Sequence, residues 1–501
     1  MKRSKHSLSH YRLTTLNMGE LYPVACEEVL PGDSFRHQTS ALIRVSPLVA
    51  PVMHPVHLMV HSWYVPTRLL WDGWENFITG KDQTKVVPTI TLSKTDTDTF
   101  RFAQSLGVGA ENPPGPITLS SLPFRAYNKI WNEFYRDQDL NVPLPEHIGD
   151  TGDTITDYKV QNVSWEKDYF TTARTYPQQG PDTEVVQLAL SGKLPVQGFG
   201  KRSQTFSQAA NQQFYESDGT LKTYADSSTI DSGTNDQVFG VEEDPTKLGY
   251  PNVHVDLTNL DGAVNMDINE WRRSMAMQRM KEHRNRFGSR YRDMLAFLGV
   301  NSSDARLQRP EYLGGGKQTI SFSEVLSTAD TVNAVVGDLA GHGIAAMRTR
   351  PYKRFFEEHG YMLTFLSARP VSVYMDRVPR HFMRRDYSQY WQKELEMMGD
   401  QPVTNFEVYG DAASPAGTFG FIPRYDEYRH AESFVSGEFR TILDYWHMAR
   451  KFTAQPALNG TFVSCDPTDR IYASAINDQL YAMVSHRISA RRLVSKRARN
   501  A

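Results

Sequence analysis

Long apolar runs, cysteine pairs and enzyme signatures are all missing from this chain of 501 residues. No run of about 18 apolar residues occurs, so we expect no transmembrane helix. The N-terminus, MKRSKHSLSHYRL, is basic but leads into no apolar stretch, so we expect no secretory signal. Cys26 and Cys465 are too few for a disulfide framework, which is compatible with a reducing compartment.

Catalytic motifs are equally scarce. None of the patterns G-x-S-x-G, H-E-x-x-H and C-x-x-C occurs, and no carboxylate pair stands out as an acid and a base. The run LGGGKQT (313–319) looks like a phosphate loop, but Glu311 stands where that motif needs glycine and Gln318 where it needs Ser or Thr. We interpret its glycines as residues that allow the backbone to follow a tight path before the next strand. The sequence therefore predicts no catalytic residue, no metal ligand and no cofactor.

Three closely spaced histidines, His54, His57 and His61, raise the question of a zinc site. Their surroundings, with proline, valine and aromatic residues, favour a strand. On a strand His57 and His61 share a face, but four residues separate them by about 13 Å. Zinc needs each nitrogen within about 2.1 Å of one ion. We therefore predict a strand here and no metal site.

The sequence as a whole predicts an all-β protein. Short β-rich runs, punctuated by proline and glycine, are separated by long irregular connections, which is typical of a β-sandwich and suits a jelly roll with large loops. The predicted strands include 41–49, 55–65, 319–326, 359–375, 404–410 and 418–425. Apolar stripes at helical spacing predict helices at 123–137, 268–287 and 438–452. Residues 198–262 are polar and poor in large aliphatic side chains, which predicts a surface excursion.

Positive charge is concentrated at both ends of a chain whose net charge is −2. No acid interrupts these ends, which favours a polyanion as partner, although solvated tails are the competing interpretation. The predicted nucleic-acid-binding residues are Lys2, Arg3, Lys5, Arg12, Arg491, Arg492, Lys496 and Arg497. The stretch 272–292 interleaves basic and aromatic residues, which is typical either of single-stranded nucleic acid binding or of a solvated helix face.

Several longer stretches together resemble the major capsid proteins of the Microviridae, small tailless phages, and fit the gokushovirus-like branch best. They follow the family's order between about residues 20 and 460. The stretches are SWYVPTRLLWDGWENFITG (62–80), PFRAYNKIWNEFYRDQDLN (123–141), KDYFTTARTYPQQG (167–180), GSRYRDMLAFLGVNSSDARLQRPEYLGGG (288–316), EEHGYMLTFLSARP (357–370) and FGFIPRYDEYRHAESFVSGEFRTILDYWHMARKF (419–452).

The resemblance implies an eight-stranded viral jelly roll that assembles with identical copies into a small T=1 icosahedral shell around a circular single-stranded DNA genome. It implies one domain at 35–480 between a basic arm at 1–34 and a basic tail at 481–501, with the insertion at 198–262 forming a protrusion at the threefold axes. The further partners it implies are small DNA-binding, DNA-pilot and internal scaffolding proteins and a host-surface receptor. The protein would be assembled in the bacterial cytoplasm and reside in the virion.

A different class of protein also fits an aromatic-rich jelly roll. A carbohydrate-active protein, either a hydrolase or a lectin, would stack its aromatic side chains on sugars, and a hydrolase would use two carboxylates as acid and base. That alternative explains neither the basic ends nor the polar excursion. We therefore expect a structural protein and not an enzyme.

Overall fold

A computed structural model describes residues 3–93, 97–109, 115–178, 268–328, 337–474 and 478–496, together with short strands between 193 and 256. The chain divides into two compact units. The first combines Met1–Gln179 with Lys281–Ala501, and the second is Gly180–Met280.

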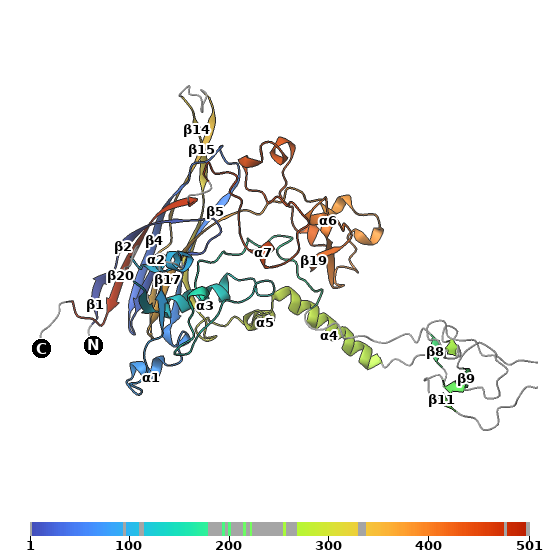
Figure 1. The fold of residues 1–501 in the computed structure, drawn as a ribbon, viewed down its shortest axis with the longest axis horizontal. Helices are drawn as coiled ribbons and strands as arrows, with labels where there is room; N and C mark the ends of the chain where they lie inside the picture. Colours follow the sequence, from blue (N-terminus) through green and yellow to red (C-terminus); the bar gives the residue numbers. More distant parts are fainter. Residues whose placement is uncertain are drawn as a thin grey trace, which may run out of the picture. The chain divides into compact units, whose positions relative to one another are not determined.

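Two antiparallel sheets form the centre of the first unit (Figure 1). The larger sheet has the strand order β1-β20-β4-β15-β14, with β2 also paired to β20 and β16 to β4. Its strands are β1 (Ser4–Ser7), β2 (His10–Leu16), β4 (Ser34–Val45), β14 (Ser321–Leu326), β15 (Leu339–Arg348), β16 (Tyr352–Phe355) and β20 (Leu480–Arg492). The smaller sheet has the order β13-β5-β17-β3. Its strands are β3 (Tyr22–Val29), β5 (Val56–Pro66), β13 (Glu311–Thr319) and β17 (Gly360–Pro370).

The path of the chain between these sheets is that of a jelly roll. β2, β4, β15 and β20 lie in the larger sheet, and β3, β5, β13 and β17 lie in the smaller one. Successive strands change sheet at every step except from β5 to β13, and the first and last strands are neighbours. These are the eight strands and two Greek keys of a double-sheet jelly roll. The predicted fold class is confirmed.

The main core lies between the two sheets, because each strand turns alternate side chains inward. β4 contributes Ala41, Ile43 and Val45 to this core, and β20 contributes Leu480, Ala482 and Val484. They meet Val56, Leu58 and Val60 of β5 and Leu366 and Ala368 of β17 from the opposite sheet.

A second core covers the outer face of the smaller sheet. Trp63 of β5 and Phe365 of β17 pack here against α2 (Thr97–Leu106) and α3 (Leu122–Phe134). In α3, Tyr127 and Trp131 are buried against the sheet side. Because β5 is buried on both faces, its sequence is almost continuously apolar instead of alternating.

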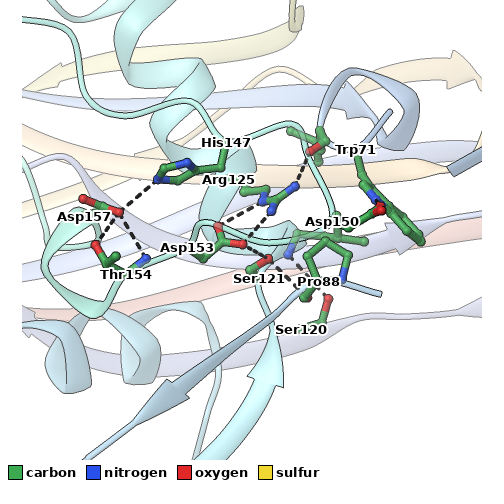
Figure 2. A network of polar contacts seen from close by, with 12 residues as sticks. Trp71, Pro88, Ser120, Ser121, Arg125, His147, Asp150, Asp153, Thr154 and Asp157 are labelled. Atoms are coloured by element: carbon green, nitrogen blue, oxygen red, sulfur yellow. Dashed lines mark hydrogen bonds and ion pairs between the residues drawn. The ribbon is translucent and has the colours of Figure 1, made fainter. Parts of the chain in front are cut away.

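A buried polar network fixes the connections beside α3 (Figure 2). The Arg125 side chain is 2% exposed and that of Asp153 is 1% exposed, and Nε of Arg125 donates to Oδ1 of Asp153 at 3.0 Å. Arg125 Nη1 also donates to the carbonyl oxygen of Leu70 at 3.0 Å. Burial disfavours the charged form of Asp153, but hydrogen bonds from Arg125 and Tyr158 outweigh it and lower the pKa of this carboxyl. The loops over the smaller sheet are therefore held by a buried ion pair as well as by apolar contacts.

Smaller elements complete both units. A third apolar cluster surrounds Phe170, Tyr374 and Phe462. The remaining elements of the first unit are α1 (Trp74–Ile78), β6 (Thr89–Leu92), β7 (Ile117–Ser120), α5 (Tyr291–Phe297), β18 (Asp400–Thr404), α6 (Asn405–Val408), β19 (Thr418–Pro423) and α7 (Gly460–Val463). In the second unit β9 (Phe199–Lys201), β10 (Phe214–Glu216) and β11 (Leu221–Lys222) form one sheet, and β8 (Lys193–Pro195) pairs with β12 (His254–Asp256). α4 (Ile268–Phe287) extends across the boundary between the units.

Two local predictions are wrong. The predicted strand at 404–410 is largely the helix α6, because Thr404 begins it with a capping box in which Glu407 accepts from the Thr404 backbone at 2.9 Å. The predicted helix at 438–452 contains only short 3-10 turns. Arg470 donates to the backbone carbonyls of Asp444 and Ala449 there, so those groups are satisfied without a helix.

The predicted limits of the jelly roll also need correction. β1, β2 and β3 lie inside the segment predicted as a basic arm, 1–34, and β20 (Leu480–Arg492) occupies the first half of the predicted tail, 481–501. These strands belong to the sheets because their alternate side chains, such as Val484 and Ile488, fill the core. Most of the predicted insertion, 198–262, lies outside the described residues, and its whole range falls within the second unit.

Candidate nucleic-acid interface

The outer face of the larger sheet carries a concentration of cations. These side chains alternate along their strands with the buried core positions, so they all point away from the core. We call this surface the basic face and define it by Lys5, Arg36, Arg44, Arg348, Lys353, Arg487 and Arg491, all exposed.

Strand register brings these residues together from distant parts of the chain. Lys5 of β1 lies opposite Arg491 of β20, and Ser489, two positions earlier, lies opposite Arg36 of β4. Arg36 in turn lies opposite Lys353 of β16. Directly opposed residues on neighbouring strands are about 4.5–5.5 Å apart at Cβ. The cations therefore form one continuous surface across four strands.

Acidic side chains are nearly absent from this face within the described residues: Asp478, beside the exposed Thr15 at one end of the face, is paired with Arg101 at 3.3 Å. The strands of the larger sheet contain a single acid, Glu324, and it lies opposite Gly341 on the inward-facing row of β15. None of the residues that define the basic face forms an ion pair with a described carboxylate, and Arg348 donates to the neutral Gln38 at 3.0 Å. A cationic surface without internal counter-charges has a positive potential that attracts a polyanion.

One end of the basic face holds a groove of about 880 Å³ with aromatic and apolar walls. Leu13, Leu42, Tyr481 and Met483 line it from the sheet, and Arg44 lies among them. The Tyr481 ring is 40% exposed. A groove that combines cations with exposed rings is suited to a single-stranded nucleic acid, because phosphates meet the cations and bases stack on the rings.

Some of the residues predicted from the chain ends lie at this surface. Lys5 and Arg491 belong to the basic face, and the guanidinium of Arg3 lies 4.9 Å from the centre of the Phe355 ring at its edge. Lys496 is exposed beyond the end of β20. Lys2 and Arg497 lie outside the described residues.

Two other predicted residues point to the inner side of the sheet. Arg12 donates to the backbone oxygen of Ser105, and burial lowers the pKa of its guanidinium. Arg492 forms an ion pair with the fully buried Asp33 at 2.9 Å and lies 5.3 Å from the centre of the Phe35 ring. The structure therefore assigns both arginines to contacts within the chain, and we leave them out of the interface.

Several residues of the basic face were not predicted. Arg36, Arg44, Arg348 and Lys353 lie in the middle of the sequence, far from either charged end. One local signal was available in SFRHQTSALIRV (34–45), where Arg36 and Arg44 are an even number of positions apart and so share a face of one strand.

The basic stretch 272–292 is partly used inside the chain. Arg286 pairs with Asp400 at 3.2 Å, and Arg290 donates to the carbonyl oxygen of Asn132 at 2.8 Å. For these two residues the contacts agree with a structural role of that stretch.

Comparison with known proteins decides the family. The sequence matches the family described as capsid protein (F protein) over residues 1–496. The chain belongs to this phage capsid protein family. Capsid protein VP1 of Chlamydia phage 1 is 32% identical, in an alignment that covers 96% of this chain and 92% of the relative. VP1 of Bdellovibrio phage phiMH2K is 30% identical over 93% and 89% of the two chains, and VP1 of Spiroplasma virus 4 is 28% identical over 95% and 90%.

The match to the F-protein family and the similarity to the three VP1 proteins confirm the predicted gokushovirus-like resemblance and the structural role. Proteins of this family are shell components of phage virions, so the chain assembles into a multi-subunit capsid and is not an enzyme. The carbohydrate-active alternative receives no support from these relatives. In the described part of the chain, no helix is both long and apolar enough to cross a membrane.

Proposed function

We propose that this capsid subunit forms a small icosahedral T=1 shell around a circular single-stranded DNA genome and turns its basic face toward that genome. The observation that carries this proposal is the outer face of the larger sheet, whose described strands present several cations and no acid on their outward-facing rows.

The two outer faces of the jelly roll differ in a way that supports this orientation. Helices α2 and α3 and their connections cover the smaller sheet. No described helix covers the outer face of the larger sheet, and exposed side chains such as Tyr11 and Leu13, each 70% exposed, remain on its surface. Packing a genome brings many phosphates close together, and a bare cationic sheet offsets their mutual repulsion by releasing counterions.

The other partners implied by the resemblance are part of the same proposal. A small DNA-binding protein, a DNA-pilot protein and an internal scaffolding protein would act inside or during assembly, in the host cytoplasm. A host-surface receptor would meet the outside of the shell. The insertion at 198–262 would supply the threefold protrusion, because it falls in a separate compact unit inserted into the jelly-roll chain.

Charge removal on the basic face tests the orientation. The double variant Arg36→Gln/Arg487→Gln should still form particles but retain less DNA, because two exposed cations are lost without a change in the core. A plot of the logarithm of the DNA-binding constant against the logarithm of the salt concentration has a negative slope. For single-stranded DNA, each phosphate contact that is removed should reduce the steepness of this slope by about 0.7. Particle yield, DNA content and the salt dependence of DNA binding by the purified subunit are the measurements.

A matched control uses two exposed arginines outside the basic face, Arg306→Gln/Arg385→Gln. The control should keep both DNA content and salt slope. Equal DNA content and an equal salt slope for the two double variants would contradict the proposed orientation.

A further inference from the structure

The hairpin formed by β14 and β15 extends beyond the rest of the larger sheet (Figure 1). β15 is paired with β4 only through Ile344–Arg348, and the backbone of Leu48 bridges to Gly341. Toward the tip, residues 324–326 of β14 pair with 339–341 of β15. Beyond Gly341, no further described strand is paired to the hairpin on either side.

This outer part of the hairpin is exposed on both faces. A strand that covers a core buries every second side chain, but in β14 the consecutive residues Ser323–Leu326 are all exposed. Val325 is 45% exposed, Leu326 is 57% exposed, and Leu339 opposite Leu326 is 41% exposed. An isolated two-stranded ribbon is marginally stable in water, and exposed apolar side chains at its tip add no stability. A partner that covers these side chains would stabilise the hairpin.

The outer edge of β14 has few of the features that normally prevent strand pairing, and its only charged side chain is Glu324. Natural edge strands are protected by lysine and other charged side chains, by proline, by bulges, by short length or by a covering helix or loop. The sequence SFSEVL contains no lysine and no proline, and its register against β15 is regular from Ser321 to Leu326. By contrast, the opposite edge of the same sheet is interrupted between β1 and β2 and carries Lys5 and Arg12.

We propose that the free edge of β14 is a contact between subunits, where it pairs through backbone hydrogen bonds with a strand of a second copy of this chain. The proposal rests on the shell assembly described above. A row of free N–H and C=O groups along an edge is best satisfied by another extended strand. A closed shell holds identical copies at fixed positions, so a second copy is the partner that is always present. The exposed Val325, Leu326 and Leu339 side chains would be covered by the same neighbour.

A photo-crosslinker placed on β14 tests this contact in the assembled particle. Benzoylphenylalanine in place of Val325 should give covalent dimers of this chain on a denaturing gel after particles are irradiated. The control position is Leu13, which is 70% exposed on the outer face of the larger sheet and should give no dimer.

The outcomes of the crosslinking experiment distinguish a failure of the proposed strand contact from a failure of shell assembly. Particles of normal size that yield no dimer from position 325, or that yield a crosslink to a different protein, overturn the proposed pairing and leave the capsid role intact. A wild-type chain that forms no particles with its assembly helpers contradicts the shell and the pairing together.

Introducing positive charge on the free edge of β14 gives a second test of the proposed pairing. Val325→Lys/Leu326→Lys should lower particle yield by about tenfold, because lysine on an edge strand opposes pairing with another strand. The unfolding midpoint of the unassembled subunit should not change, since neither side chain is in the core. The matched control is Val86→Lys/Val142→Lys, which alters two residues that are 72% and 84% exposed elsewhere. Particle yield equal to that of this control would overturn the proposal.

Discussion

Three histidines meet inside the jelly roll, at the end where β2, β4 and β20 run side by side. The ring of His486 lies 5.0 Å from that of His10 and 5.4 Å from that of His37, centre to centre. His37 Nδ1 is 2.8 Å from the hydroxyl of Tyr352, and His37 Nε2 is 3.2 Å from His486 Nδ1. Burial, reinforced by the neighbouring histidines, lowers the pKa of His37 to about 4 and that of His486 to about 3.

These shifts predict a loss of stability in acid. The folded chain holds His37 and His486 neutral, whereas the unfolded chain takes up protons near the ordinary histidine pKa of about 6.5. The contribution of both groups is therefore complete above pH 6.5 and is lost as the pH falls toward about 4 for His37 and about 3 for His486. Thermal unfolding of the subunit between pH 7.5 and 4.5 should show a falling midpoint.

A variant without the two titrating groups checks this assignment. His37→Gln/His486→Gln should show a shallower dependence of the unfolding midpoint on pH than the wild type, whatever its absolute stability. The exposed His381→Gln should keep the full dependence. An identical slope in all three proteins would show that the cluster does not govern the acid response. His54 and His61, whose pKa values burial lowers to about 4, account for a residual slope.

The buried ion pair of Arg125 and Asp153 predicts a large effect of a single substitution. Arg125→Met leaves the Asp153 carboxylate buried without its main partner, which typically costs about 3–5 kcal/mol. The matched control is Lys129→Met, which breaks the partly exposed pair with Glu146 and should cost at most about 1 kcal/mol. Chemical denaturation of the subunit measures both, and similar losses for the two variants would contradict a special role for the buried pair.

At the scale of elements, β20 is the strand on which the larger sheet depends. It pairs with β4 from Leu480 to Arg491 on one side and with β1 and β2 on the other. Deleting 480–501 should therefore abolish cooperative unfolding, while deleting only 493–501 should preserve it. Circular dichroism and thermal unfolding of the two truncated chains provide the test. Cooperative unfolding of the longer deletion at the wild-type midpoint would show that β20 is dispensable.

The sequence predicted elements best where the local pattern and the tertiary contacts agree. β5 and α3 were predicted because valine and aromatic residues, or an apolar stripe, match the surfaces they bury. The segment around 438–452 has a helical stripe, but its carbonyls bind the side chain of Arg470, which is distant in sequence. Long-range contacts of that kind are not readable from a local window.

The candidate interface was only partly predictable for the same reason. The concentration of positive charge at the ends of the chain predicted Lys5 and Arg491 as nucleic-acid-binding residues. Arg36, Lys353 and Arg487 become neighbours only when β4 pairs with β16 and β20. Strand pairing, and not local composition, therefore creates the basic face.

At the scale of the whole molecule, the described helices cover only one of the two outer sheet faces of the jelly roll. Helices and long connections cover the smaller sheet, and the larger sheet presents cations and exposed rings. A shell subunit with this asymmetry has a natural inner surface for a polyanionic genome.

The most direct test of this orientation is a cryo-electron microscopy reconstruction of the assembled, DNA-filled particle. The larger sheet should lie on the inner side of the shell, with genome density beside Arg36, Arg487 and Arg491. A reconstruction in which this sheet faces the outside, or in which the ordered genome lies only against other parts of the subunit, would contradict it.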